Sequence, residues 1–240
     1  MGWNHGQILI HARNVSVEYR RRRSFFRLDR VTALQDINME IRAGESLGVI
    51  GRNGVGKTTL LRLLADIIVP DRGVVENFGA TTAMLSMQAG FDLFATGRTN
   101  IVLSGLLLGY TEQQIHERMD EIISFSELRE FIDQTLIGYS AGMRARLGFS
   151  VCYHMHPDVL LIDEALGVGD LDFRMKSAGA MREKIRSEQT VVLVSHDSNT
   201  IRSLCDRALW IENGVNRMDG ETEQVVAAYQ EYVTSHPRKA

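Results

Sequence analysis

The feature that most constrains this chain is the loop at residues 51–58, which matches the pattern G-x-x-x-x-G-K-[ST]. An apolar segment at residues 46–50 precedes the loop, and residues 57–67 place leucines at the spacing of a buried helix. In a strand, glycine loop and helix of this order, backbone N–H groups at the helix N-terminus can surround phosphate oxygens. The sequence therefore predicts a nucleoside triphosphate site.

The residues of this loop are expected to divide the work of binding. Lys57 supplies a positive charge to the β and γ phosphates, and Thr58 offers its hydroxyl to Mg²⁺. The three loop glycines permit the close backbone approach. The residues expected to contact nucleotide here are Gly51, Asn53, Gly54, Gly56, Lys57, Thr58 and Thr59.

Polar side chains follow two other apolar segments that read as buried strands. Asp163 and Glu164 come directly after residues 159–162, and His196 follows residues 190–194. In α/β sheets, ligand chemistry lies at the carboxyl ends of the strands. We expect Asp163 to hold Mg²⁺, Glu164 to activate the attacking water, and His196 to hydrogen-bond the γ-phosphate.

The remaining pattern predicts an α/β protein with a mostly parallel, doubly wound sheet. Short apolar segments near the N-terminus indicate an additional antiparallel β layer, and two amphipathic stretches in the middle of the chain indicate a helical subdomain. The segments concerned are residues 8–19 and 31–41 for the β layer, and 111–132 and 142–154 for the helices.

Charge gives little reason to expect a nucleic-acid partner, because 27 Lys plus Arg oppose 30 Asp plus Glu. The exception is local: residues 20–30 contain six arginines interleaved with Phe25 and Phe26. One interpretation is a solvated loop kept open by its charges. The other is a surface for anionic headgroups or for the cytoplasmic face of a partner.

The order of these motifs resembles the ABC ATPase family over nearly the whole chain. Residues 51–58 look like Walker A, and Asp163 and Glu164 look like the end of Walker B. His196 resembles the switch histidine, Asp170 the D-loop aspartate, and residues 140–142 the signature usually written L-S-G-G-Q. The resemblance implies a single ABC ATPase domain over residues 1–240, with a coupling loop and helical subdomain at about 88–157.

The signature also has a physical reading. A serine hydroxyl at Ser140, a tight backbone at Gly142 and a following helix N-terminus make a second anion site. In the family this site caps the ATP that the opposite protomer holds, and each chain here has one copy of each motif. The resemblance therefore implies a homodimer around two MgATP molecules.

Two further positions leave alternatives open. Tyr19 is placed to stack on adenine, or else is buried as an ordinary strand residue. Gln88 lies about where the family has its Q-loop glutamine, which contacts Mg²⁺ or couples to the membrane partner, although related exporter subunits vary there.

Within the family, the chain looks most like the ATP-binding subunits that export O-antigen, capsule or teichoic acid. The stretches that carry this likeness are residues 96–101, 139–151, 163–170 and 194–197. The implied function is ATP hydrolysis at the cytoplasmic face of the inner membrane, where a separate permease exports a lipid-linked polysaccharide. Membrane association would come through that partner. An ABC ATPase for a drug or peptide, a soluble regulatory ATPase and a P-loop kinase are the alternatives.

Overall fold

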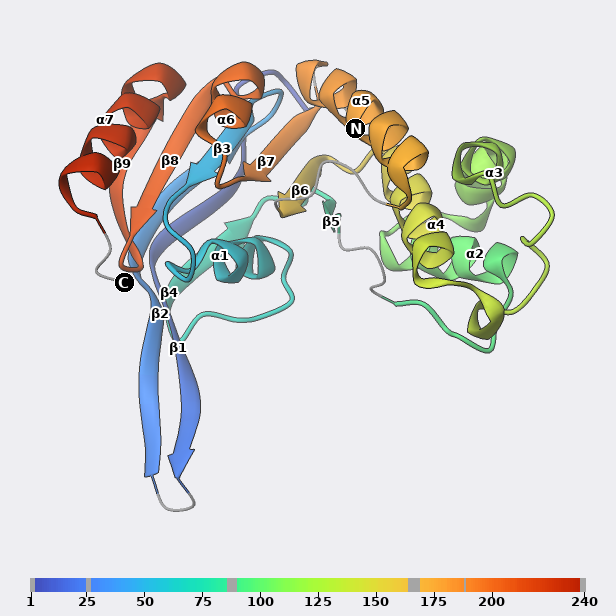
Figure 1. Ribbon diagram of the computed structural model, residues 1–240, viewed down its shortest axis with the longest axis horizontal. Helices are drawn as coiled ribbons and strands as arrows, with labels where there is room; N and C mark the ends of the chain where they lie inside the picture. Colours follow the sequence, from blue (N-terminus) through green and yellow to red (C-terminus); the bar gives the residue numbers. More distant parts are fainter. Residues whose placement is uncertain (1–2, 25–26, 86–89, 164–168, 188, 238–240) are drawn as a thin grey trace.

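The computed structural model describes residues 3–24, 27–85, 90–163, 169–187 and 189–237 (Figure 1). Its main sheet is six-stranded, in the order β5-β6-β7-β3-β8-β9, and every neighbouring pair is parallel except β8 with β9. Its strands are β3 (Ser46–Ile50), β5 (Thr82–Met84), β6 (Val159–Asp163), β7 (Thr190–Val194), β8 (Arg207–Glu212) and β9 (Val215–Glu221). The mostly parallel sheet is confirmed. Its central strands β3 and β7 are buried throughout, as expected for strands covered on both faces.

The predicted antiparallel layer is a second sheet of order β2-β1-β4. It comprises β1 (Ile8–Ser24), β2 (Arg27–Arg42) and β4 (Arg72–Asn77). The solvated-loop interpretation of residues 20–30 is wrong for the backbone, because strand pairing continues to Ser24 opposite Arg27. Backbone groups form this ladder whatever the side chains carry, so a charged run can still form strands in an exposed ribbon. Figure 1 shows the paired strands extending well beyond the body of the molecule.

Three helices form a separate group on one side of the main sheet (Figure 1). They are α2 (Gly97–Leu107), α3 (Glu112–Ser126) and α4 (Ala141–His154), with a short 3-10 turn η1 (Leu136–Gly138) before α4. Thr111 and Gln114 form a capping box at the start of α3, and Ile115 and Ile122 lie on its buried face. These helices share a hydrophobic core of their own, so the predicted helical subdomain is present.

Each of the other helices follows a strand of the main sheet along the chain. They are α1 (Lys57–Leu64), α5 (Leu171–Arg186), α6 (Ser198–Leu204) and α7 (Thr222–Ser235). The helix predicted over residues 57–67 ends early, since Asp66 adopts a left-handed conformation with φ of 56° that closes the last turn. Strand β6 shows how the sheet separates two more cores: Leu161 faces the core shared with the antiparallel layer, and Leu160 faces the opposite core. Within the described residues, every helix is too short or too polar to span a bilayer.

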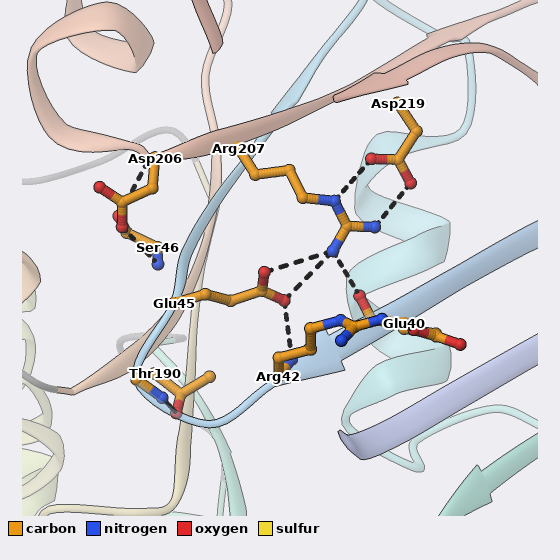
Figure 2. Close-up of polar contacts among 9 residues, drawn as sticks. Glu40, Arg42, Glu45, Ser46, Thr190, Asp206, Arg207 and Asp219 are labelled. Atoms are coloured by element: carbon orange, nitrogen blue, oxygen red, sulfur yellow. Dashed lines mark hydrogen bonds and ion pairs between the residues drawn. The ribbon is translucent and has the colours of Figure 1, made fainter. Parts of the chain in front are cut away.

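An ionic network fastens the amino ends of β3 and β8 (Figure 2). The Arg207 guanidinium donates to both carboxylate oxygens of Asp219 at 2.7 Å, and to both oxygens of Glu45 at 3.3 Å. Burial raises the pKa of Glu45 although Arg207 opposes this effect. Asp206 accepts a 2.6 Å hydrogen bond from the hydroxyl of Ser46 close by. These contacts fix the sheet at the edge opposite the carboxyl ends of its strands.

Candidate nucleotide site

Two glycines of residues 51–58, Gly51 and Gly56, are required by close contacts with neighbouring strands. A Cβ on Gly51 would lie 2.2 Å from the carbonyl oxygen of Ile211, and one on Gly56 would lie 2.4 Å from that of Ala33. Gly56 also has a φ of 105° as the N-cap residue of α1. The loop therefore lies tightly between β3 and α1, with the helix N-terminus presented to a ligand.

Beside this loop lies an open pocket of about 580 Å³, which we call the P-loop pocket. Loop residues form one side of the pocket and the base of the β1–β2 hairpin forms another. The lining residues are Tyr19, Val31, Thr32, Ala33, Asn53, Gly54, Gly56, Lys57, Thr58, Thr59 and Asp163. Its size is within the range of small-molecule sites. The structure thus brings together residues from three separate parts of the chain that the sequence assigned to nucleotide, adenine and metal binding.

Lys57 is the buried cation of this pocket. Its side chain rises from the first residue of α1, and its Nζ donates to the carbonyl oxygens of Gly51 at 2.8 Å and Arg52 at 3.1 Å. The ammonium group is therefore held above the loop by backbone oxygens. A phosphate oxygen, which carries more negative charge, would compete for the same donors.

Asp163 is the last residue of β6, where it pairs with Val194 of the neighbouring β7. Asp163 and Thr58 line the same pocket as Lys57. Two hard oxygen donors suit Mg²⁺, which also takes ligands from phosphates and water. No group of three or more His, Cys, Asp or Glu that could hold a metal occurs in the described part of the chain. Thr58 and Asp163 therefore fit an ion that takes its other ligands from phosphate and water.

His196 follows β7, next to both β6 and β3 in the sheet order. Its side chain is exposed and belongs to the same edge of the sheet as Asp163 and the loop, but it is not among the residues that line the pocket. Asp197 caps α6, and a hydrogen bond from the Thr200 hydroxyl holds the pKa of its carboxyl below the usual range. The histidine thus lies at a firmly capped strand-to-helix turn.

The predicted signature residues belong to a different part of the structure. Ser140 is the N-cap of α4, where its hydroxyl accepts a 3.1 Å bond from the N–H of Met143, and Gly142 is in the first turn. Asp170 is the N-cap of α5 and accepts a 3.1 Å bond from the N–H of Phe173. Among the described residues that line the P-loop pocket, Ser140, Gly142 and Asp170 do not occur. Arg146 connects the two helix starts because its guanidinium donates to the Asp170 carboxylate.

Tyr19 remains 38% exposed, so the alternative in which it is a buried strand residue is wrong. Its hydroxyl lies 3.4 Å from that of Thr59, and its ring contributes to the wall of the pocket. Glu164 and Gln88, expected at the catalytic and metal positions, lie outside the described residues.

Some lining residues carried no signal in the sequence. Val31, Thr32 and Ala33 read as ordinary strand residues, and only the pairing of β2 against β1 brings them to the pocket. Arg146 was also missed as a link between helices, since sequence spacing alone does not show which charges on two helices meet.

Comparison with known proteins identifies this arrangement. The model of the ABC transporter family matches residues 34–167, which include the P-loop, Asp163 and the signature segment. The chain belongs to the ABC transporter family. Membership confirms the predicted fold class and the predicted class of enzyme, an ATPase.

Curated relatives in the ABC transporter family include export proteins. The "O-antigen export system ATP-binding protein RfbB" of Myxococcus xanthus is 45% identical over 204 residues, 85% of this chain and 47% of the relative. The Klebsiella pneumoniae protein of the same name is 43% identical over 199 residues, 83% of this chain and 81% of the relative. The "Teichoic acids export ATP-binding protein TagH" of Lactococcus lactis is 44% identical over 201 residues, 84% of this chain and 43% of the relative. The chain therefore spans less than half the length of the first and third of these relatives.

Solved structures support the ABC transporter fold. An "ATP binding subunit of ABC transporter" aligns with a TM-score of 0.73 at 18% identity, covering 92% of this chain and 93% of that one. A dimeric bacterial ABC transporter cassette aligns with a TM-score of 0.69 at 20% identity, covering 89% and 98%. At these identities the likeness shows the fold alone.

Proposed function

We propose that this chain binds MgATP in the P-loop pocket and hydrolyses it to drive export of a lipid-linked polysaccharide through a separate membrane permease. The observation that carries this proposal is the identity of 43–45% to O-antigen export ATP-binding proteins over more than four fifths of the chain. The chain would act at the cytoplasmic face of the inner membrane, held there by the permease.

In the chemical step, loop N–H groups and Lys57 bind the phosphates and neutralise charge that develops on them. Thr58 and Asp163 hold the Mg²⁺, which polarises the phosphate oxygens when bound. Glu164 accepts the proton of the attacking water, and His196 donates to an oxygen of the transferred phosphoryl group. The observations in support are that Lys57, Thr58 and Asp163 line one pocket and that His196 follows the adjacent strand.

A second copy of the chain completes the site. Ser140 and Gly142 begin α4, a helix whose N-terminal N–H groups suit an anion, yet neither residue lines the pocket of its own chain. A head-to-tail dimer places them on the nucleotide of the partner subunit, with Asp170 beside them. Tyr19 stacks on the adenine from the hairpin side.

The permease binds an apolar groove where the helical subdomain meets the sheet. The groove has a volume of about 260 Å³ and contains Ile67, Met84, Phe91 and Leu107 among its lining residues. Leu107 is 71% exposed, which is unusual for a leucine beside an apolar groove. The groove overlaps residues 88–108, which together with the helical subdomain are where we predict the coupling contacts, including any role of Gln88.

The first experiment measures the mass of Glu164→Gln protein with and without MgATP. We expect conversion from monomer to dimer on adding MgATP, because the substitution removes the base and keeps the binding groups. Ser140→Trp in the same background should abolish the dimer by filling the second anion site. A variant that binds ATP and stays monomeric even with its permease present contradicts the sandwich mechanism.

Cargo and coupling need the permease. Cells that carry only Glu164→Gln should lose surface polysaccharide and accumulate the lipid-linked form inside. Leu107→Asp should reduce co-purification with the permease while leaving ATP binding intact. Val69→Asp is the matched control, because Val69 is equally exposed, at 79%, and lies outside the groove. Normal surface polysaccharide in Glu164→Gln cells would exclude this cargo.

A further inference from the structure

Arg52 is the long side chain at the beginning of the phosphate loop, and it points toward the end of α7. It is absent from the described lining of the P-loop pocket and instead lines a polar cavity of about 370 Å³ together with Asn213 and Gly214 of the β8–β9 turn. Arg52 comes directly after Gly51, and the close approach of Gly51 to Ile211 fixes the backbone at the start of the loop. The side chain therefore reaches a part of the fold outside the described lining of the P-loop pocket.

That part is the end of the last helix. The Arg52 guanidinium donates to the carbonyl oxygen of His236, the C-cap of α7, and its Cζ lies 5.3 Å from the ring centre of Tyr232. Carbonyl oxygens at a helix C-terminus lack helical donors and carry the negative end of the helix dipole. An arginine that also covers an aromatic ring suits this place better than any neutral side chain.

Tyr232, the ring that Arg52 covers, also contacts two other aromatic side chains. The ring of Tyr232 stacks on His236 with centres 4.5 Å apart and an interplanar angle of 21°. It also contacts Trp210 of β8, with ring centres 5.1 Å apart. Trp210 belongs to the strand that pairs with β3, directly before the loop. The helix end and the loop are thus connected through the sheet as well as through Arg52.

The backbone of Arg52 takes part in the phosphate site. Its carbonyl oxygen accepts the 3.1 Å bond from Nζ of Lys57, beside the 2.8 Å bond to Gly51. One residue therefore contacts α7 through its side chain and the phosphate-binding lysine through its backbone. Loss of the guanidinium contact would remove one restraint on the residue whose carbonyl Lys57 binds.

We propose that Arg52 is a positioning residue through which the end of α7 sets the conformation of the phosphate loop and hence its affinity for nucleotide. The inference rests on the proposed binding of ATP but not on the cargo or the permease. It also implies that a change at the end of α7 alters the affinity for nucleotide, although α7 has no residue in the described lining of the P-loop pocket.

The test compares nucleotide affinity in variants at both ends of this contact. Arg52→Ala and Tyr232→Ala should each weaken MgADP binding by about three- to tenfold and raise KM for ATP more than they lower kcat. Because both act through one contact, the double variant should bind no more weakly than the weaker single variant. Arg52→Lys and Tyr232→Phe, which keep a cation and a ring, should restore most of the affinity.

A matched control is available in Arg217 of β9, whose Cζ lies 5.8 Å from the same Tyr232 ring. Arg217 is not part of the phosphate loop, so Arg217→Ala should leave MgADP affinity unchanged. An equal loss in Arg217→Ala would show a general disturbance of the ring rather than positioning of the loop. Unchanged affinity in Tyr232→Ala, or additive losses in the double variant, would overturn the proposal.

A spectroscopic readout separates positioning from stability. The chain has two tryptophans, so Trp3→Phe leaves Trp210, next to Tyr232, as the reporter. MgADP should change the Trp210 emission in this background, and adding Arg52→Ala should remove most of the change. If the Trp3→Phe protein does not bind MgADP at all, the proposed function fails. If it binds and Arg52→Ala gives the same emission change, only the positioning role fails.

Discussion

Arg146 of α4 donates a hydrogen bond to the carboxylate of Asp170, the residue that caps the N-terminus of α5. The same guanidinium donates to Glu127 at 3.2 Å, and its Cζ lies 5.3 Å from the ring centre of Phe173. The helix that begins with the predicted signature and the helix that begins with the predicted D-loop aspartate are thus joined close to their N-termini. Two groups that serve the same nucleotide in our proposal are held in one arrangement.

Arg146→Ala should therefore lower kcat for ATP several-fold and reduce the free energy of unfolding by about 1 to 2 kcal/mol, the worth of a charged hydrogen bond. Steady-state ATPase rates and chemical denaturation measure the two effects. Asp172→Asn is the control, because Asp172 is an exposed acid in the first turn of the same helix. A fall in stability without any change in kcat would show that the ion pair is only structural.

Lys57→Gln should weaken ATP binding by about ten- to a hundredfold, the worth of one or two charged hydrogen bonds. Two carbonyl oxygens lose their donor, but the amide of glutamine replaces part of the contact, so the unfolding temperature should change little. Equilibrium titration with a fluorescent nucleotide and thermal unfolding give the two values. Near-normal binding would remove Lys57 from the phosphate site.

Arg207→Met should reduce the free energy of unfolding by about 2 to 3 kcal/mol, because it leaves Glu45 and Asp219 without their shared cation. Arg42→Ala removes a more exposed ion pair, 2.6 Å from Glu40, and should cost less than about 1 kcal/mol. ATP affinity should persist in both variants, since the network lies at the far edge of the sheet. An equal loss of unfolding free energy in the two variants would contradict the expectation that the more buried ion pair contributes more to stability.

The pH dependence of the Arg207→Met effect follows from Glu45. Burial raises the pKa of this carboxyl above its ordinary value of 4.5, so the native state binds the proton more tightly than the unfolded chain does. This contribution to stability is fully present below pH 4.5 and is lost as the pH rises through the raised pKa. Removing Arg207 raises the pKa further, so the variant should lose more stability at pH 7 than near pH 4 in denaturant titrations.

The two cysteines should be unreactive in the folded protein. Burial raises the pKa of Cys152 to about 11 and that of Cys205 to about 12, which leaves very little thiolate near neutrality. Disulfide-exchange reagents at pH 8 should react at least about tenfold more slowly with native protein than with protein in denaturant. Rapid reaction of the native protein would mean that one of these thiols is more accessible than the structure indicates.

The sequence predicted the parts of the site that depend on spacing along the chain. Residues 51–58 and His196 follow buried strands and Asp163 ends one, and the carboxyl ends of neighbouring parallel strands meet at one edge of the sheet. The position of Tyr19 stayed ambiguous in the sequence. Successive side chains of a strand point to opposite faces of the sheet, but this pattern does not show which face lies toward residues 51–58. The pairing of Tyr19 with Val31 and the approach of Thr59 resolve its place.

Contacts between elements that are far apart in the chain could not be predicted from the sequence. The arginines at residues 20–23 suggested an open loop because charge indicates exposure, and exposure does not distinguish a loop from an outlying ribbon. The contact of Arg52 with His236 joins positions 184 residues apart, and no periodicity links them. Such contacts depend on which elements the tertiary fold brings together.

Helix α4 has a consequence for how movement can pass through the molecule. One of its faces, with Leu147 and Val151, packs in the core of the helical subdomain, and another, with Ala145 and Phe149, packs in a core of the main sheet. Because α4 packs in both cores, a displacement of the helical subdomain relative to the main sheet would also move α4. Such a displacement would reach Ser140 at the N-terminus of α4, the residue that in our proposal meets the nucleotide of the partner subunit.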